Sequence, residues 1–221
     1  AVTPIVYNLK GGLYLAKKDT GAAEAAFKKA IEKNSNYLRP YFSLARIYMS
    51  GNREDEAIAQ YTAVLEKDPN QAGSHMMMGT IYEMQKRYDL AEKHYRKTLE
   101  INSEFAPAAN NLAYILAEKN RNLDEALVFA RKAKELLPED PNVMDTLGWI
   151  YYKKGFYDNA VAELSDALEK LSDNPIVHYH LGMALYKKGE TDQARSRLER
   201  ALSIDTDFEG AAEARETLAK L

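Results

Sequence analysis

Four histidines, His75, His94, His178 and His180, are the side chains in this sequence best suited to acid–base or metal chemistry near neutral pH. His178 and His180 lie two residues apart in a segment of helical composition, so their side chains should point to different faces and not converge on a metal ion. His75 and His178 occupy the same place in a repeat described below, and we interpret both as packing residues.

Sequence motifs for catalysis are missing. GxSxG, GxGxxG, the P-loop and HExxH, which position a nucleophile, a phosphate or a zinc ion, do not occur. The chain also has no cysteine, so disulfides, thiolate catalysis and cysteine-ligated zinc are excluded. Carboxylates such as Glu54, Asp55 and Glu56 stand at an expected helix start, where they complement the helix dipole. We therefore expect a protein that is not an enzyme and uses no metal ion or cofactor.

Charge and hydropathy limit the class of partner. The 30 basic and 33 acidic side chains give a net charge of −3, which provides no general attraction to nucleic acid or to an anionic membrane surface. No stretch approaches about 20 uninterrupted apolar residues, so direct membrane insertion is not expected. The first residues, AVTPIVYNLK, lack the basic start and apolar run of a signal peptide. The sequence leaves the compartment open between cytoplasm and periplasm.

A repeat organises almost the whole chain. Alanine recurs at intervals of 34, 34, 35, 34 and 34 residues, at Ala23, Ala57, Ala91, Ala126, Ala160 and Ala194. These alanines divide the chain into six units without linkers: residues 4–37, 38–71, 72–105, 106–140, 141–174 and 175–208. A period of this length is typical of solenoid proteins, in which each unit buries its apolar face against the next. We expect one continuous array over residues 1–221.

Each unit has the pattern of two amphipathic helices joined by a tight turn. The eighth position of the unit always carries a small residue: Gly11, Ala45, Gly79, Ala113, Gly148 and Gly182. A small residue there allows the first helix to approach the second closely, and the recurring alanine, at position 20, makes the same contact from the second helix. Proline in segments such as EKDPN (66–70) ends one unit and prepares the next.

These residues resemble the tetratricopeptide repeat (TPR) family, whose pattern is W-L-G-Y-A-F-A-P at positions 4, 7, 8, 11, 20, 24, 27 and 32. The fifth unit matches it with Leu147, Gly148, Tyr151, Ala160 and Ala167. The resemblance implies an all-α fold, a right-handed α-solenoid of six helix-turn-helix units. Residues 209–221 are expected to add a capping helix over the apolar end of the last unit. Phrases such as DTLGWIYYKKGFYDNAV are similar to those of bacterial TPR proteins.

In the TPR family the ligand-facing positions lie mainly on the first helix of each unit, along the concave surface. The partner-binding residues that the resemblance implies are Arg39, Phe42, Arg46, Met49, Met76, Thr80, Asn110, Tyr114, Asp145, Trp149, Tyr152, Tyr179, Met183 and Tyr186. Aromatic and methionine side chains are enriched at binding surfaces. Trp149 stands at position 9 and not at the aromatic packing position 4, so we expect it outside the core. The alternative is that these side chains pack against adjacent first helices.

The leading hypothesis is a non-catalytic protein–protein interaction scaffold that binds a peptide or helix of a partner on its concave Met/aromatic surface. We expect an apolar ligand segment with an acidic residue, because Arg39 and Arg46 should lie near Phe42 and Met49. The bacterial resemblance suggests an envelope, secretion or polysaccharide assembly system. Two alternatives stay open: a homo-oligomer built by end-to-end packing of repeats, because no cap covers the first helix, or the regulatory fragment of a larger enzyme.

Overall fold

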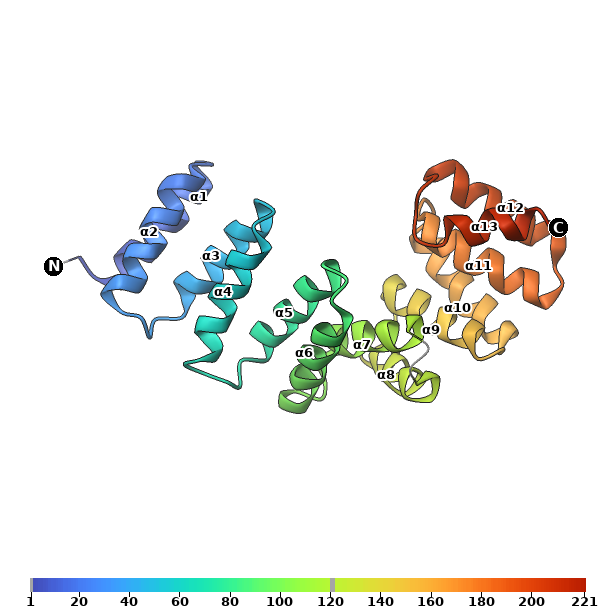
Figure 1. Cartoon of the computed structure of the whole chain (residues 1–221), viewed down its shortest axis with the longest axis horizontal. Helices are drawn as coiled ribbons and strands as arrows, with labels where there is room; N and C mark the ends of the chain where they lie inside the picture. The colour runs from blue at the N-terminus through green and yellow to red at the C-terminus, as the bar shows by residue number, and fades with distance from the viewer. Residues whose placement is uncertain (1, 120–121) are drawn as a thin grey trace. The chain divides into compact units, whose positions relative to one another are not determined.

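The computed structural model describes residues 2–119 and 122–221, and these form thirteen α-helices and no strand. The helices fall into two compact parts, residues 1–103 and 104–221. The N-terminal part contains α1 (Pro4–Ala16), α2 (Thr20–Lys33), α3 (Arg39–Ser50), α4 (Glu54–Leu65), α5 (Ala72–Met84) and α6 (Tyr88–Ile101), as labelled in Figure 1. The C-terminal part contains α7 (Ala106–Glu118), α8 (Leu123–Leu136), α9 (Pro141–Lys153), α10 (Tyr157–Lys170), α11 (Pro175–Lys188), α12 (Thr191–Ile204) and α13 (Ala211–Leu218).

The helices pack as six consecutive hairpins, one in each predicted repeat. In the N-terminal part α1 packs on α2, α3 on α4 and α5 on α6, and each hairpin contacts the next through α2–α3 and α4–α5. The C-terminal part repeats this scheme with α7 to α12, and α13 packs on α11 and α12. The all-α class, the six hairpins and the helix that caps the last one are confirmed. A single array with a right-handed sense over residues 1–221 stays a prediction.

Prolines and capping side chains start several of these helices. Pro4, Pro141 and Pro175 stand in the first turn of α1, α9 and α11, where a missing N–H removes no hydrogen bond. Asp140 precedes α9 and Asn174 precedes α11. Their side chains accept hydrogen bonds from backbone N–H groups of the first turn. The helix boundaries therefore follow from local sequence.

The eighth position of the repeat forms the close helix contact that the sequence predicts. A Cβ atom placed on Gly79 would lie 2.6 Å from the ring of Tyr95, and one on Gly11 would lie 2.5 Å from the ring of Phe27. A Cβ on Gly148 would lie 2.6 Å from Leu164. Each of these large residues belongs to the second helix of the same repeat, so the glycines leave the space that it fills.

The turn between the two helices has the same backbone conformation in five repeats. Its residue at position 15 is left-handed, with φ of 61° at Lys18, 53° at Asn52, 58° at Lys86, 80° at Gly155 and 88° at Gly189. Glycine adopts this conformation without steric cost, whereas a lysine Cβ crowds the neighbouring carbonyl. Helix packing therefore imposes the turn even where the residue type does not favour it.

Candidate functional site

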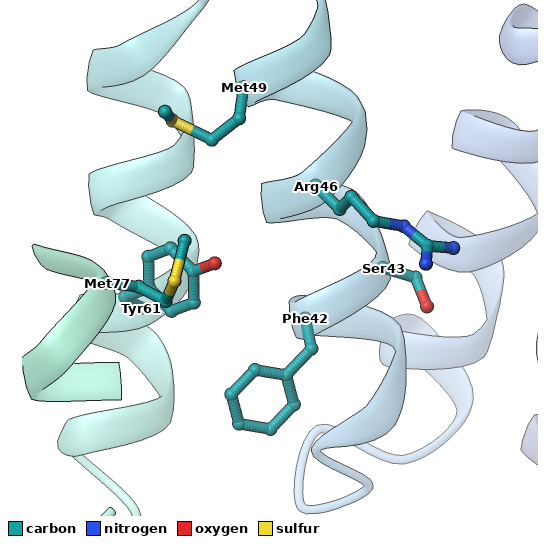
Figure 2. Close-up of a pocket in the computed structure, with 6 residues that line it drawn as sticks. All are labelled: Phe42, Ser43, Arg46, Met49, Tyr61 and Met77. Atoms are coloured by element: carbon teal, nitrogen blue, oxygen red, sulfur yellow. The ribbon is translucent and has the colours of Figure 1, made fainter. Parts of the chain in front are cut away.

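A pocket of about 400 Å³ opens in the N-terminal part, where repeats 2 and 3 meet. Its lining consists of Phe42, Ser43, Arg46 and Met49 of α3, Tyr61 of α4 and Met77 of α5. In Figure 2, Phe42 and Met49 lie on the side of Tyr61 and Met77, and the Arg46 side chain is directed away from Tyr61. The Phe42 and Tyr61 rings are 6.3 Å apart between centroids, tilted by 56°. The volume lies in the range of ligand-binding pockets.

The spacing of residues along α3 separates the pocket from the core. Phe42, Arg46 and Met49 follow one another at intervals of four and three residues, which places them on one face of the helix. The neighbouring Leu44 and Tyr48 are buried and hold α3 in the hairpin. Phe42 and Met49 are only half-buried and Met77 is 37% exposed, so the pocket presents apolar surface to solvent. Such surface gains free energy when a ligand covers it.

Unpaired positive charge borders the pocket. Arg39 and Arg46 are exposed and form no ion pair with a residue that the structure describes. Arg53 differs, because it binds Glu24 at 2.9 Å, and hydrogen bonds from Arg53 and Lys28 lower the pKa of Glu24 to about 2. Burial raises the pKa of Tyr61, so its phenol is neutral at physiological pH. A ligand carboxylate would find guanidinium groups without a competing partner.

The structure brings together only some of the residues that the sequence predicts for this part. Phe42, Arg46 and Met49 share the pocket, whereas Arg39, Met76 and Thr80 do not line it. The Thr80 hydroxyl instead donates to the Met76 carbonyl at 3.2 Å. The prediction missed Tyr61 and Met77. Tyr61 belongs to α4, the second helix of its repeat, and Met77 stands one residue beyond the predicted Met76.

In the C-terminal part three residues of the predicted surface, Trp149, Tyr179 and Met183, are buried. Exposure is 4% for Trp149, 3% for Tyr179 and 2% for Met183. They form one core cluster with Leu198, Ala201, Phe208, Ala211 and Ala214, so α13 and the loop before it cover them. The expectation that Trp149 lies outside the core is wrong. At position 9 of repeat 5, Trp149 faces α11, the first helix of the next repeat. Met183 stands at the same position of repeat 6, where α13 takes the place of that next helix.

Polar contacts and ring stacking also hold this cluster. The Trp149 indole Nε1 donates to a Glu118 carboxylate oxygen at 2.5 Å. The indole stacks on the His180 ring at 4.0 Å and on the Tyr152 ring at 4.6 Å. The Tyr179 hydroxyl donates to Glu213 of α13 at 2.6 Å. With its polar edge satisfied inside the protein, Trp149 is not available as an exposed anchor.

The other predicted residues of this part are Asn110, Tyr114, Asp145, Tyr152 and Tyr186, all half-buried. Asp145 accepts a hydrogen bond from His180 Nδ1 at 2.9 Å. Burial raises the pKa of Tyr152 to about 12. The side-chain oxygen of Asn110 is buried without a hydrogen-bond partner among the described residues.

The histidines have structural partners. His178 Nε2 donates to the Ser172 carbonyl at 3.0 Å, and His180 binds Asp145, so the two point to different faces as predicted. His75 Nε2 lies 3.2 Å from the Pro69 carbonyl, and because that oxygen only accepts, His75 donates there. Its Nδ1 then accepts the Nδ1 proton of His94 at 3.0 Å. Burial, and next the neighbouring His75, lowers the pKa of His94 to about 4.

Two kinds of site are absent from residues 2–119 and 122–221. No three His, Asp or Glu side chains in these ranges gather so as to hold a metal ion. No helix there is long and apolar enough to cross a membrane.

Sequence profiles of known families match most of the chain. Three described as tetratricopeptide repeat match residues 14–81, 76–141 and 175–208, and one described as TPR repeat matches residues 148–189. The chain belongs to the tetratricopeptide repeat family. TPR proteins are in general interaction scaffolds without catalytic activity, and membership supports that role here.

Solved TPR structures share this fold. YrrB, described as a TPR protein with an unusual peptide-binding site, is 26% identical with a TM-score of 0.68, over 86% of this chain and 98% of YrrB. PilF of Pseudomonas aeruginosa has a TM-score of 0.78 at 19% identity, over 99% of this chain and 97% of PilF. The TPR repeat-containing protein PA4667 of Pseudomonas aeruginosa is 42% identical over 50 residues, which are 23% of this chain and only 8% of PA4667.

Proposed function

We propose that this TPR chain is a non-catalytic scaffold that binds an extended peptide segment of a partner protein in the pocket of repeats 2 and 3. The observation that carries the proposal is the pocket of about 400 Å³ lined by Phe42, Met49, Tyr61 and Met77. Phe42 and Met49 are half-buried and Met77 is 37% exposed, so they keep apolar surface open to solvent beside the buried Tyr61. YrrB, which is similar over most of its length, is described as peptide-binding, and this supports the same class of ligand.

The pocket suits one apolar side chain followed by a carboxylate. The apolar side chain would insert between Phe42 and Met77, where methionine adapts its shape to different ligands. A nearby Asp or Glu of the ligand would pair with the exposed guanidinium of Arg46. The buried apolar contact supplies affinity, and the charge pair fixes the direction of the peptide.

A bacterial assembly system stays our proposal for the setting of this scaffold. PA4667 and PilF come from Pseudomonas aeruginosa, which supports a bacterial origin. The match to PA4667 spans 8% of that protein, so its biology is not transferred to this chain. Partner identity therefore has to come from a binding experiment.

The experiment is selection of 12-residue peptides from a displayed random library on the immobilised chain, followed by affinity measurement on the enriched peptide. Met77→Ala and Phe42→Ala should each weaken binding about 30-fold, the effect of removing an aromatic or apolar anchor worth about 2 kcal/mol. Arg46→Gln should weaken binding of peptides that carry an Asp or Glu side chain. This loss of affinity should be smaller at high salt.

Met84→Ala is the matched control, because Met84 is on the same helix as Met77, is 61% exposed and does not line the pocket. It should leave the affinity unchanged. Enriched peptides that bind Met77→Ala and Phe42→Ala as tightly as Met84→Ala would refute the pocket as the binding site.

A further inference from the structure

The first helix exposes an unusual amount of apolar surface. Ile5 is 58% exposed, Leu9 62% and Leu13 64%, and Val6 beside them is 39% exposed. Ile5, Leu9 and Leu13 follow one another at intervals of four residues, so they form a stripe along α1. Gly12 next to the stripe has no atom within 4 Å of where its Cβ would be, so another backbone can approach there.

Later repeats bury the part of this surface that corresponds to Val6 and Leu13. Val6 and Leu13 stand at positions 3 and 10, on the side of α1 opposite Gly11, which faces α2. At position 10 of repeats 2 and 3, Ile47 is 4% exposed and Ile81 is fully buried. In repeats 2 and 3 the first helix is covered by the helix that precedes it in the chain: α2 packs on α3, and α4 packs on α5. Val6 and Leu13 thus have the residue types of a covered helix face, whereas the positions of Ile5 and Leu9 stay exposed or half-buried in repeats 2 and 3, at Arg39, Ser43, Gly73 and Met77.

Charge around the stripe favours one kind of covering helix. Lys10 is the only charged residue of α1, and Lys17 and Lys18 follow directly at its end. All three are exposed, and none forms an ion pair with a described residue. A helix that packs on this stripe meets lysines along its edge, so carboxylates on its flanks would be paired.

We propose that the α1 stripe of Ile5, Leu9 and Leu13 docks an amphipathic helix of a partner protein that carries acidic residues beside its apolar face. The surface is separate from the peptide pocket and uses none of its residues. A second copy of the chain fits less well. Its own α1 would place Lys10 against Lys10, and its α13 has already buried its apolar Ala211 and Ala214.

The probe is a labelled synthetic peptide that copies residues 53–68. This segment spans α4, which packs on the corresponding side of α5, and it contains five acidic and two basic residues. Fluorescence anisotropy should detect binding to the full chain that weakens at least ten-fold in the double variant Leu9→Gln/Leu13→Gln. Binding should also weaken between 50 and 500 mM salt. A peptide of the same composition in scrambled order should not bind.

Val128→Gln is the matched control, because Val128 of α8 is an exposed apolar residue (66%) outside the stripe, and it should leave the affinity unchanged. Met77→Ala should also bind the probe normally, which separates this surface from the peptide pocket. Equal affinity of the double variant and wild type would overturn the proposal. So would a concentration-dependent dimer in sedimentation velocity that the double variant abolishes, because the stripe would then belong to a second copy.

Discussion

Two glycines of α5 differ in what surrounds them. A Cβ on Gly79 would lie 2.6 Å from the Tyr95 ring, whereas nothing lies within 4 Å of one on Gly73. Gly79→Ala should therefore lower the free energy of unfolding by about 1–3 kcal/mol through overpacking. Gly73→Ala should raise it by about 0.5–1 kcal/mol, because alanine favours the helix. Urea unfolding followed by circular dichroism measures both, and equal effects would contradict the assigned close contact.

The paired histidines make stability depend on pH. The pKa of His94 falls from its ordinary 6.5 to about 4, so the folded state binds fewer protons than the unfolded state between these values. The free energy of unfolding should then decrease as pH falls from 6.5 toward 4, by at most about 1.4 kcal/mol per pH unit for one group. His94→Gln should reduce this slope in urea unfolding at pH 7 and pH 5.

Glu24 titrates in a different window, which allows the two effects to be separated. Its pKa is lowered from 4.5 to about 2, so its stabilising contribution is lost only as pH falls below about 4.5. An unchanged slope between pH 7 and pH 5 in His94→Gln would assign the acid sensitivity to other groups.

Trp149 shows where reasoning from residue position alone fails. Its exposure is 4%, and its indole nitrogen donates to Glu118. Trp149→Ala should thus cost about 3–5 kcal/mol of unfolding free energy, as expected for a buried aromatic residue. Phe156→Ala, at a residue that is 49% exposed, should cost much less. A loss below about 1 kcal/mol for Trp149→Ala would favour the surface role that the sequence predicts.

At the scale of the structural element, the turn inside the third hairpin carries local strain. Lys86 has φ of 58°, the conformation that glycine has in repeats 5 and 6. Lys86→Gly should raise the free energy of unfolding by about 1 kcal/mol, because it removes the crowding of the lysine Cβ. Lys93→Gly, in the middle of α6, should lower it by about 1 kcal/mol. Opposite signs in thermal or urea unfolding would confirm the pair, and equal signs would not.

The helices and their pairing were predictable because they depend on period and on small residues such as Gly79 and Gly148. Those signals are local and recur in each repeat. Exposure of the site residues was not predictable, because it depends on which helix comes next. Trp149 is buried because α11 follows and Met183 because α13 follows, whereas Phe42 lies beside an open pocket. Met77 was missed because the expected ligand-facing residue is its neighbour Met76. Met77 lines the pocket together with residues of repeat 2.

At the scale of the whole molecule, α13 completes the last repeat. Ala211 and Ala214 cover Tyr179 and Met183. Deletion of residues 209–221 should expose this cluster and speed amide hydrogen exchange in α11 and α12 before α9 and α10, because repeats depend on their nearest neighbours. Hydrogen-exchange mass spectrometry measures this order. Uniform loss of protection over residues 104–208 would show instead that the C-terminal part opens as one cooperative block.

Among the described residues, the helices that pack extensively on one another within each part are no more than two apart along the chain. This has a mechanical consequence. Tension applied to the ends of such a part passes from repeat to repeat, and no long-range pairing has to break before one hairpin opens. A repeat of 34 residues releases up to about 110 Å of extended chain. Each part should then lengthen in steps of that size under load and shorten again when the load is removed, as an elastic tether does.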